Sequence, residues 1–173
     1  MIFLRTIFQT ILSLLCVYIL ANVLYISFEN SNLRYFLFNS EILINYLIFF
    51  WGVKKINSEI KDKKYLFLKL YSITIIIIII QIFLNYAYDY FVYNFFPKLD
   101  PYIDSSKALN IDYNGPNFFS TFYNLNEPIL NPGKFLSEFG AYSTVNNLII
   151  LAQTPIIKAL IIAFFVTYIK GRK

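Results

Sequence analysis

The sequence predicts an all-α membrane protein with four transmembrane helices. Hydrophobic residues make up 58% of the 173-residue chain and charged residues only 14%, whereas a soluble domain carries about 25% charged residues. The apolar residues also fall into four long runs, each near the ~20 residues that a helix needs to cross a bilayer. We therefore expect a single transmembrane domain that covers residues 1–173.

The first apolar run covers about residues 6–28. It is longer than the ~7–15 apolar residues of a signal peptide, so we expect it to be a retained span. The second run covers about 35–52 and the third about 66–88, with an aromatic extension of the third to Phe96. The fourth, at about 145–169, contains a proline and a lysine near its middle. A charge at that depth needs a partner or a function.

Basic residues determine the predicted orientation. Four spans place the segment between the second and third runs, the C-terminal Lys-Gly-Arg-Lys and Arg5 on one side of the membrane. This arrangement satisfies the positive-inside rule, whereas three or five spans would separate the basic clusters. Both termini are therefore expected on the basic side.

The role of the basic segment between the second and third runs has two interpretations. It serves either as a water-facing topology signal or as a binding site for anionic lipid such as cardiolipin. Nucleic acid is not an expected partner, because arginine and aromatic residues do not interleave with these lysines. The candidate lipid-binding residues are Lys54, Lys55, Lys61, Lys63 and Lys64.

Residues 97–144 are a long loop rich in proline and aromatic residues. Within it, Asn131, Pro132 and Gly140 stand where a short helix would have its N-cap, first residue and C-terminal glycine. The aromatic side chains fit an interfacial layer on the headgroups, a docking surface for neighbouring subunits, or a lid over a substrate path. The residues expected to meet a partner are Phe118, Phe119, Phe122, Tyr123, Phe135 and Phe139.

Polar residues inside the predicted spans repeat at helical spacing. Glu41 and Asn45 share one face of the second run, and Gln81 and Asn85 share one face of the third. We expect these faces to form polar contacts between helices. The alternative is a pathway for protons or a small solute, for which Glu41 and Lys158 are the available ionisable groups. A face of small residues in the fourth run predicts close helix packing and consists of Ala152, Pro155, Ala159 and Ala163.

Three kinds of partner for the Lys158 ammonium remain open. Gln81 lies at a similar depth, and carbonyls freed by Pro155 would assist a hydrogen bond between the two side chains. Glu41 lies about 10 Å nearer the outer surface by helical rise, at the limit of reach. The other possibilities are a carboxylate of a neighbouring subunit and a functional ion site.

The sequence offers little material for catalysis. It contains no histidine, and Cys16 is its single cysteine, which excludes an internal disulfide, the common zinc sites and histidine-based acid–base chemistry. We therefore predict no catalytic, cofactor-binding or metal-binding residues, and bound phospholipid is the one expected ligand. A membrane enzyme would have to use four aspartates that form no known spacing, Asp89, Asp100, Asp104 and Asp112.

The composition, with 19 Phe and 15 Tyr among many Ile and Asn residues, resembles the small hydrophobic proteins that protist mitochondrial genomes encode, such as those of ciliates. No family motif accompanies this compositional resemblance. Many such proteins are subunits of respiratory complexes or of the ATP synthase. The resemblance implies a structural, non-catalytic accessory subunit of a mitochondrial inner-membrane complex, surrounded by other membrane subunits. The alternative is a small bacterial inner-membrane transporter or channel-like protein that uses Glu41 and Lys158.

Overall fold

The computed structural model describes residues 2–28, 31–96, 128–131 and 144–168. Its elements in these ranges are helices, which confirms the all-α prediction. The predicted partner-loop residues Phe118, Phe119, Phe122, Tyr123, Phe135 and Phe139 lie outside the described residues. The helices are α1 (Ile2–Ser27), α2 (Ser31–Glu59), α3 (Leu66–Phe95), α7 (Thr144–Gln153) and α8 (Pro155–Tyr168).

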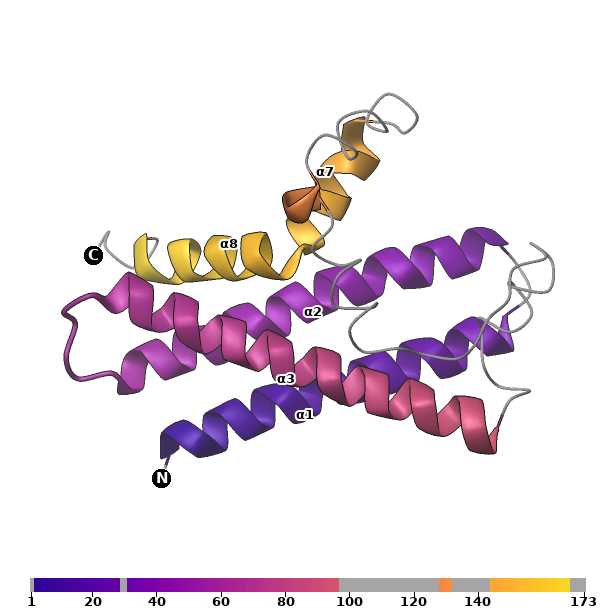
Figure 1. Cartoon of the computed structure of the whole chain (residues 1–173), viewed down its shortest axis with the longest axis horizontal. Coiled ribbons are helices and arrows are strands. Elements are labelled where there is room, and N and C mark those ends of the chain that lie inside the picture. The colour runs from indigo at the N-terminus through magenta and orange to yellow at the C-terminus, as the bar shows by residue number, and fades with distance from the viewer. Residues whose placement is uncertain (1, 29–30, 97–127, 132–143, 169–173) are drawn as a thin grey trace.

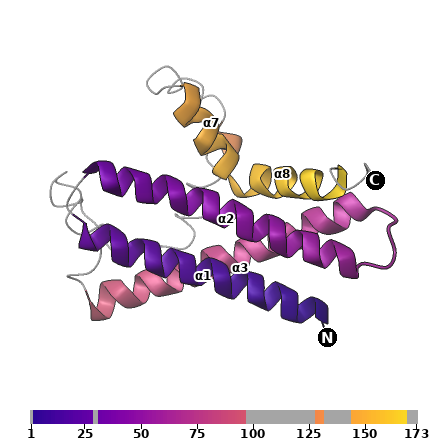
Figure 2. The same cartoon turned by 180° about the vertical axis from the view of Figure 1, so that it is seen from behind.

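The helices α1, α2 and α3 run along one another, and α8 covers one half of this group while α7 turns away from it (Figures 1 and 2). The packing of α1 is chiefly against α2, and that of α8 is chiefly against α3. The start of α1, the α2–α3 connection and the end of α8 lie at the same end of the molecule (Figure 1). We call this the basic end, because the lysines at 54–64 are located there.

The core lies where α2, α3 and α8 meet, with α1 packed along α2. Its fully buried side chains include Phe49 and Val53 from α2 and Ile77 from α3. Ala159 and Ala163 of α8 have no exposed surface, so small side chains let this helix approach its neighbours closely. Pro155 is also buried, whereas Ala152 is half-buried.

The α2–α3 connection is held by local polar contacts. The Lys63 ammonium donates to the Asn57 carbonyl at 2.6 Å, which satisfies one of the carbonyls left unpaired at the end of α2. Tyr65, directly before α3, has φ 54° and ψ 33°, the left-handed conformation that non-glycine residues seldom adopt. A tight reversal between two long helices follows from this geometry.

Two helices are long and apolar enough to cross a membrane, Phe3–Ser27 within α1 and the whole of α3. Among the described residues, only the first and the third of the four predicted spans therefore meet the length and hydropathy of a membrane-crossing helix. The α2 helix is longer than the predicted 35–52, and Asn39, Glu41 and Asn45 lower its hydropathy. The prediction of one continuous helix at 145–169 is wrong, because the chain breaks at Thr154 into α7 and a 14-residue α8. A proline removes a backbone donor and its ring collides with the preceding turn, which accounts for the break.

Candidate functional site

The break between α7 and α8 lies against α2. Pro155 has no N–H, and the Leu151 carbonyl instead accepts the Thr154 N–H at 3.2 Å and the Thr154 hydroxyl at 2.9 Å. The Ala152 carbonyl accepts a hydrogen bond from the Tyr46 hydroxyl of α2. The first backbone bond into α8 runs from the Lys158 N–H to the Thr154 carbonyl at 2.8 Å. A tyrosine of the bundle therefore satisfies a carbonyl at the end of α7.

The Lys158 side chain projects from the first turn of α8 onto two aromatic rings of α2. Its ammonium lies 4.4 Å from the ring centre of Phe49 and 5.2 Å from that of Tyr46. A cation over an aromatic face gains about 2 kcal/mol when both groups are removed from water. Among the described residues, no side chain forms a hydrogen bond or an ion pair within 4.0 Å with this ammonium.

Glu41 is the carboxylate whose charge acts on Lys158 across the α2–α8 interface, at a separation beyond that of a direct ion pair. It accepts a hydrogen bond from the Asn45 amide at 3.4 Å. Asn45 is only 8% exposed, and its side-chain oxygen has no hydrogen-bond partner in the described part of the chain. An unsatisfied amide oxygen thus lies one turn from Glu41 on α2, the helix whose aromatic rings hold Lys158.

The expected hydrogen bond between Lys158 and Gln81 does not form. Gln81 is buried within α3 at 8% exposure, and the Asn85 side-chain oxygen is buried without a hydrogen-bond partner among the described residues. Lys158 turns instead toward α2, because Tyr46 and Phe49 offer it an aromatic surface there. Neither Tyr46 nor Phe49 was among the residues predicted from the sequence. Phe49 could have been found from its spacing, since it follows Asn45 by four residues on the same helical face.

A second polar seam joins α1 and α2 near the basic end. The Thr6 hydroxyl donates to the Glu59 carboxylate at 3.0 Å, and the Lys55 ammonium lies 3.4 Å from the Gln9 side-chain oxygen. Beyond these contacts, farther from the basic end, Gly52 faces Thr10 so closely that an added Cβ would lie 2.3 Å from the Thr10 hydroxyl oxygen. Close approach of the two helices therefore depends on glycine at this position.

Toward the opposite end, α1 is tied to α3. The Tyr18 hydroxyl lies 2.8 Å from both carboxylate oxygens of Asp89, and the Tyr18 ring packs edge-on against Tyr88 at 6.0 Å. Asp89 was one of the four aspartates that a membrane enzyme would have to use, and its carboxylate here forms a hydrogen bond with Tyr18. The other three, Asp100, Asp104 and Asp112, lie outside the described residues.

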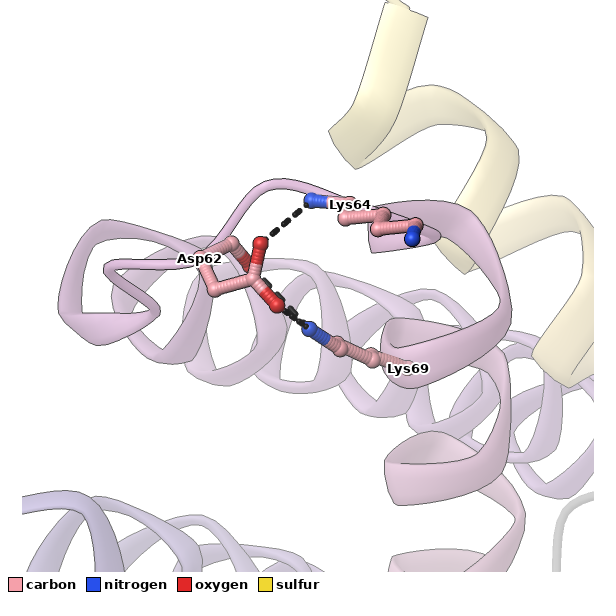
Figure 3. A network of polar contacts seen from close by, with 3 residues as sticks. All are labelled: Asp62, Lys64 and Lys69. Atoms are coloured by element: carbon pink, nitrogen blue, oxygen red, sulfur yellow. Dashed lines mark hydrogen bonds and ion pairs between the residues drawn. The ribbon is translucent and has the colours of Figure 1, made fainter.

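Asp62 organises the α2–α3 connection (Figure 3). Its carboxylate accepts the Lys69 ammonium at 2.6 Å and the Lys64 backbone N–H at 2.9 Å. The hydrogen bond from Lys69, followed by that from Lys64, lowers the pKa of Asp62 below its ordinary value of 3.8. The Lys64 side-chain nitrogen points away from this carboxylate (Figure 3).

We expect Asp62 to add a small acid-sensitive contribution to stability. Because its pKa is lower in the folded chain, the contribution is present above the ordinary value of 3.8 and is lost as the pH falls through the lowered value. Thermal denaturation in detergent between pH 6 and the acid limit, about pH 2, measures this loss. Asp62→Asn should flatten that part of the profile, and identical profiles for both proteins would contradict the assignment.

The described residues contain no group of three or more histidine, cysteine, aspartate or glutamate side chains that could hold a metal ion. Cys16 is exposed on α1. The arrangement can hold a charge between helices and fix a helix break. Comparison with protein families, curated proteins and solved structures finds no match to this chain.

Proposed function

We propose that this chain is an integral membrane subunit of a larger assembly, contributing helix packing, lipid contacts and partner docking rather than chemistry. The apolar helices support this proposal, because only 17% of the spanning window of α1 and 33% of that of α3 is buried. A core helix of a soluble protein would be mostly buried. Large side chains such as Ile76 and Phe83 of α3 are half exposed, which suits contact with lipid or with neighbouring subunits.

The observation that carries the proposal is the common position of the basic residues. Lys54, Lys55 and the 60–65 connection lie at the end where α1 begins and α8 ends (Figure 1). Four membrane-crossing segments produce this arrangement, with α2 as the second and the broken α7–α8 pair as the fourth. The positive-inside rule then assigns the basic end to the side from which the chain is inserted.

The proposed compartment and the proposed complex rest on the amino-acid composition of the chain. Abundance of Phe, Tyr, Ile and Asn, as in organelle-encoded subunits, favours a mitochondrial inner-membrane complex of the respiratory chain or the ATP synthase. A divergent α7 fits an assembly role, because it points away from α1, α2 and α3 (Figures 1 and 2). The 97–144 loop is the proposed docking segment.

Extraction of the native membrane in mild detergent tests this proposal. We expect the chain to migrate with a set of other membrane proteins at a size far above its own 20.4 kDa. A second run in harsher detergent should release it and leave it prone to aggregation. A chain that is monodisperse, stable and alone in the mild detergent would contradict the assembly role.

A second candidate is a small bacterial transporter or channel-like protein. A specific observation favours it, because the helix break and Lys158 lie against α2, which also carries Glu41 and the unsatisfied Asn45 oxygen. Broken helices beside charged groups form ion and solute sites in many transporters.

Solute flux into liposomes distinguishes the two candidates. If the chain transports, Lys158→Met and Glu41→Gln should each abolish flux, because each removes one intramembrane charge. The control is Lys54→Gln, an exposed charge at the basic end, which should leave flux unchanged. Equal flux in all four proteins would rule out transport through this site.

A further inference from the structure

The basic end holds more positive charge than its own carboxylates can neutralise. Two acidic residues are described there, and both are engaged: Asp62 pairs with Lys69, and Glu59 accepts from Thr6 on the buried α1–α2 seam. Lys63 is used on the Asn57 backbone and side chain. The basic residues left without a carboxylate partner in the described chain are Arg5, Lys54, Lys55, Lys61 and Lys64.

Two of these cations lie near each other where α1 packs against α2. Lys55 of α2 reaches the Gln9 oxygen of α1 at 3.4 Å, and Arg5 is exposed one turn before Gln9 on the same face of α1. The Lys55 ammonium also lies 5.2 Å from the centre of the Trp51 ring, which is 50% exposed. Tryptophan prefers the boundary between headgroups and acyl chains.

Exposed apolar side chains follow these cations along both helices, away from the basic end. On α2, Leu47 lies one turn from Trp51 and is 60% exposed; on α1, Leu12 lies one turn beyond Phe8 and is 48% exposed. Cations at one end and unburied aliphatic side chains along the rest match a molecule with an anionic head and apolar tails. A soluble phosphate compound would make no use of the apolar part.

We propose that the α1–α2 surface formed by Arg5, Gln9, Lys55 and Trp51 binds the headgroup phosphate of an anionic phospholipid, with its acyl chains along Leu12 and Leu47. The site rests on the proposed membrane location, which gives this surface access to lipid. It assigns lipid recognition to α1 and α2 together and not to the lysines of the 60–65 connection. Charged headgroups gain about 1 kcal/mol for each basic residue near the surface.

Trp51 is the only tryptophan of the chain and therefore reports on this surface. The full chain is reconstituted in phosphatidylcholine vesicles that contain either brominated phosphatidylglycerol or brominated phosphatidylcholine, whose bromine quenches tryptophan fluorescence on contact. We expect the anionic lipid to quench Trp51 at lower mole fraction. Arg5→Gln and Lys55→Gln should each reduce that preference about five-fold, the change that corresponds to one basic residue. Lys61→Gln, with the same loss of charge in the connection, should leave the preference unchanged.

The outcomes separate the lipid site from the membrane location. Equal quenching by both lipids would overturn the headgroup site and leave the chain in the bilayer. Quenching by neither would contradict the membrane location itself. A preference that disappears when inorganic phosphate is added in excess would assign this surface to a soluble phosphate ligand, and equal loss in Lys61→Gln would reduce the site to a diffuse surface charge.

Discussion

Replacement of Gly52 by leucine is expected to lower the free energy of unfolding by about 1–3 kcal/mol, the usual cost of overpacking a tight interface. The reason is the crossing of α1 and α2. An added Cβ would lie 2.3, 2.7 and 3.1 Å from the Oγ1, Cγ2 and Cβ atoms of Thr10, which is fully buried. A β-branched side chain in a helix has little freedom to rotate away. The helices must therefore separate.

Denaturation of the purified chain in detergent micelles measures the change. Ser13→Leu is the matched control, because Ser13 is exposed on α1 and the same enlargement there meets no neighbouring helix in the described chain. We expect it to change the free energy of unfolding by less than about 0.5 kcal/mol. Equal effects of the two substitutions would show that α1 and α2 do not approach closely at Gly52.

The Gly52→Ala and Thr10→Ala pair tests the cause. Alanine is favoured over glycine within a helix by about 1 kcal/mol, so Gly52→Ala alone should stabilise the chain if nothing obstructs it. We expect destabilisation instead, and recovery of stability when Thr10→Ala removes the two nearest atoms. Additive effects in the double variant would contradict direct contact between the two positions.

The all-α class could be read from the sequence because it depends on quantities that add along the chain. Hydropathy and run length place α1 and α3 within a few residues of their bounds. The spacing of Thr74, Ile78 and Gln81 also indicates one face of α3, and these three side chains are buried in the structure. Such patterns arise from one helix alone and need no knowledge of its neighbours.

The break at Pro155 and the environment of Lys158 depend on contacts between helices. A hydropathy average over a window of residues does not detect one missing N–H. The residues of α7 and α8 were therefore predicted as a single span. The membrane depths taken from helical rise assume straight, parallel helices, and on that assumption Gln81 was the side chain closest in depth to Lys158. The ammonium instead lies over Phe49 of α2, and the sequence marks Ala159 and Ala163 as small without naming the helix they pack against.

Tyr46→Phe is expected to cost about 0.5–1.5 kcal/mol of stability, because it leaves the half-buried Ala152 carbonyl without this donor. The substitution keeps the ring on which Lys158 rests and removes only the hydroxyl. Tyr71→Phe is the control, since Tyr71 is half-buried on α3 and its hydroxyl has no hydrogen bond in the described chain. Comparable losses in the two variants would contradict a specific role of the Tyr46 hydroxyl.

The same bond should also determine where α7 points. Pro155 removes the continuous backbone hydrogen bonds that would hold α7 in line with α8, so the Tyr46 hydroxyl is a direct link from α2 to the end of α7. Spin labels at Leu43→Cys and Leu148→Cys, both exposed positions, report the α2–α7 distance in a Cys16→Ser background. We expect one narrow distance distribution in the parent chain and a broad one in Tyr46→Phe. A narrow distribution in both would show that packing at Pro155, and not the tyrosine, determines the direction of α7.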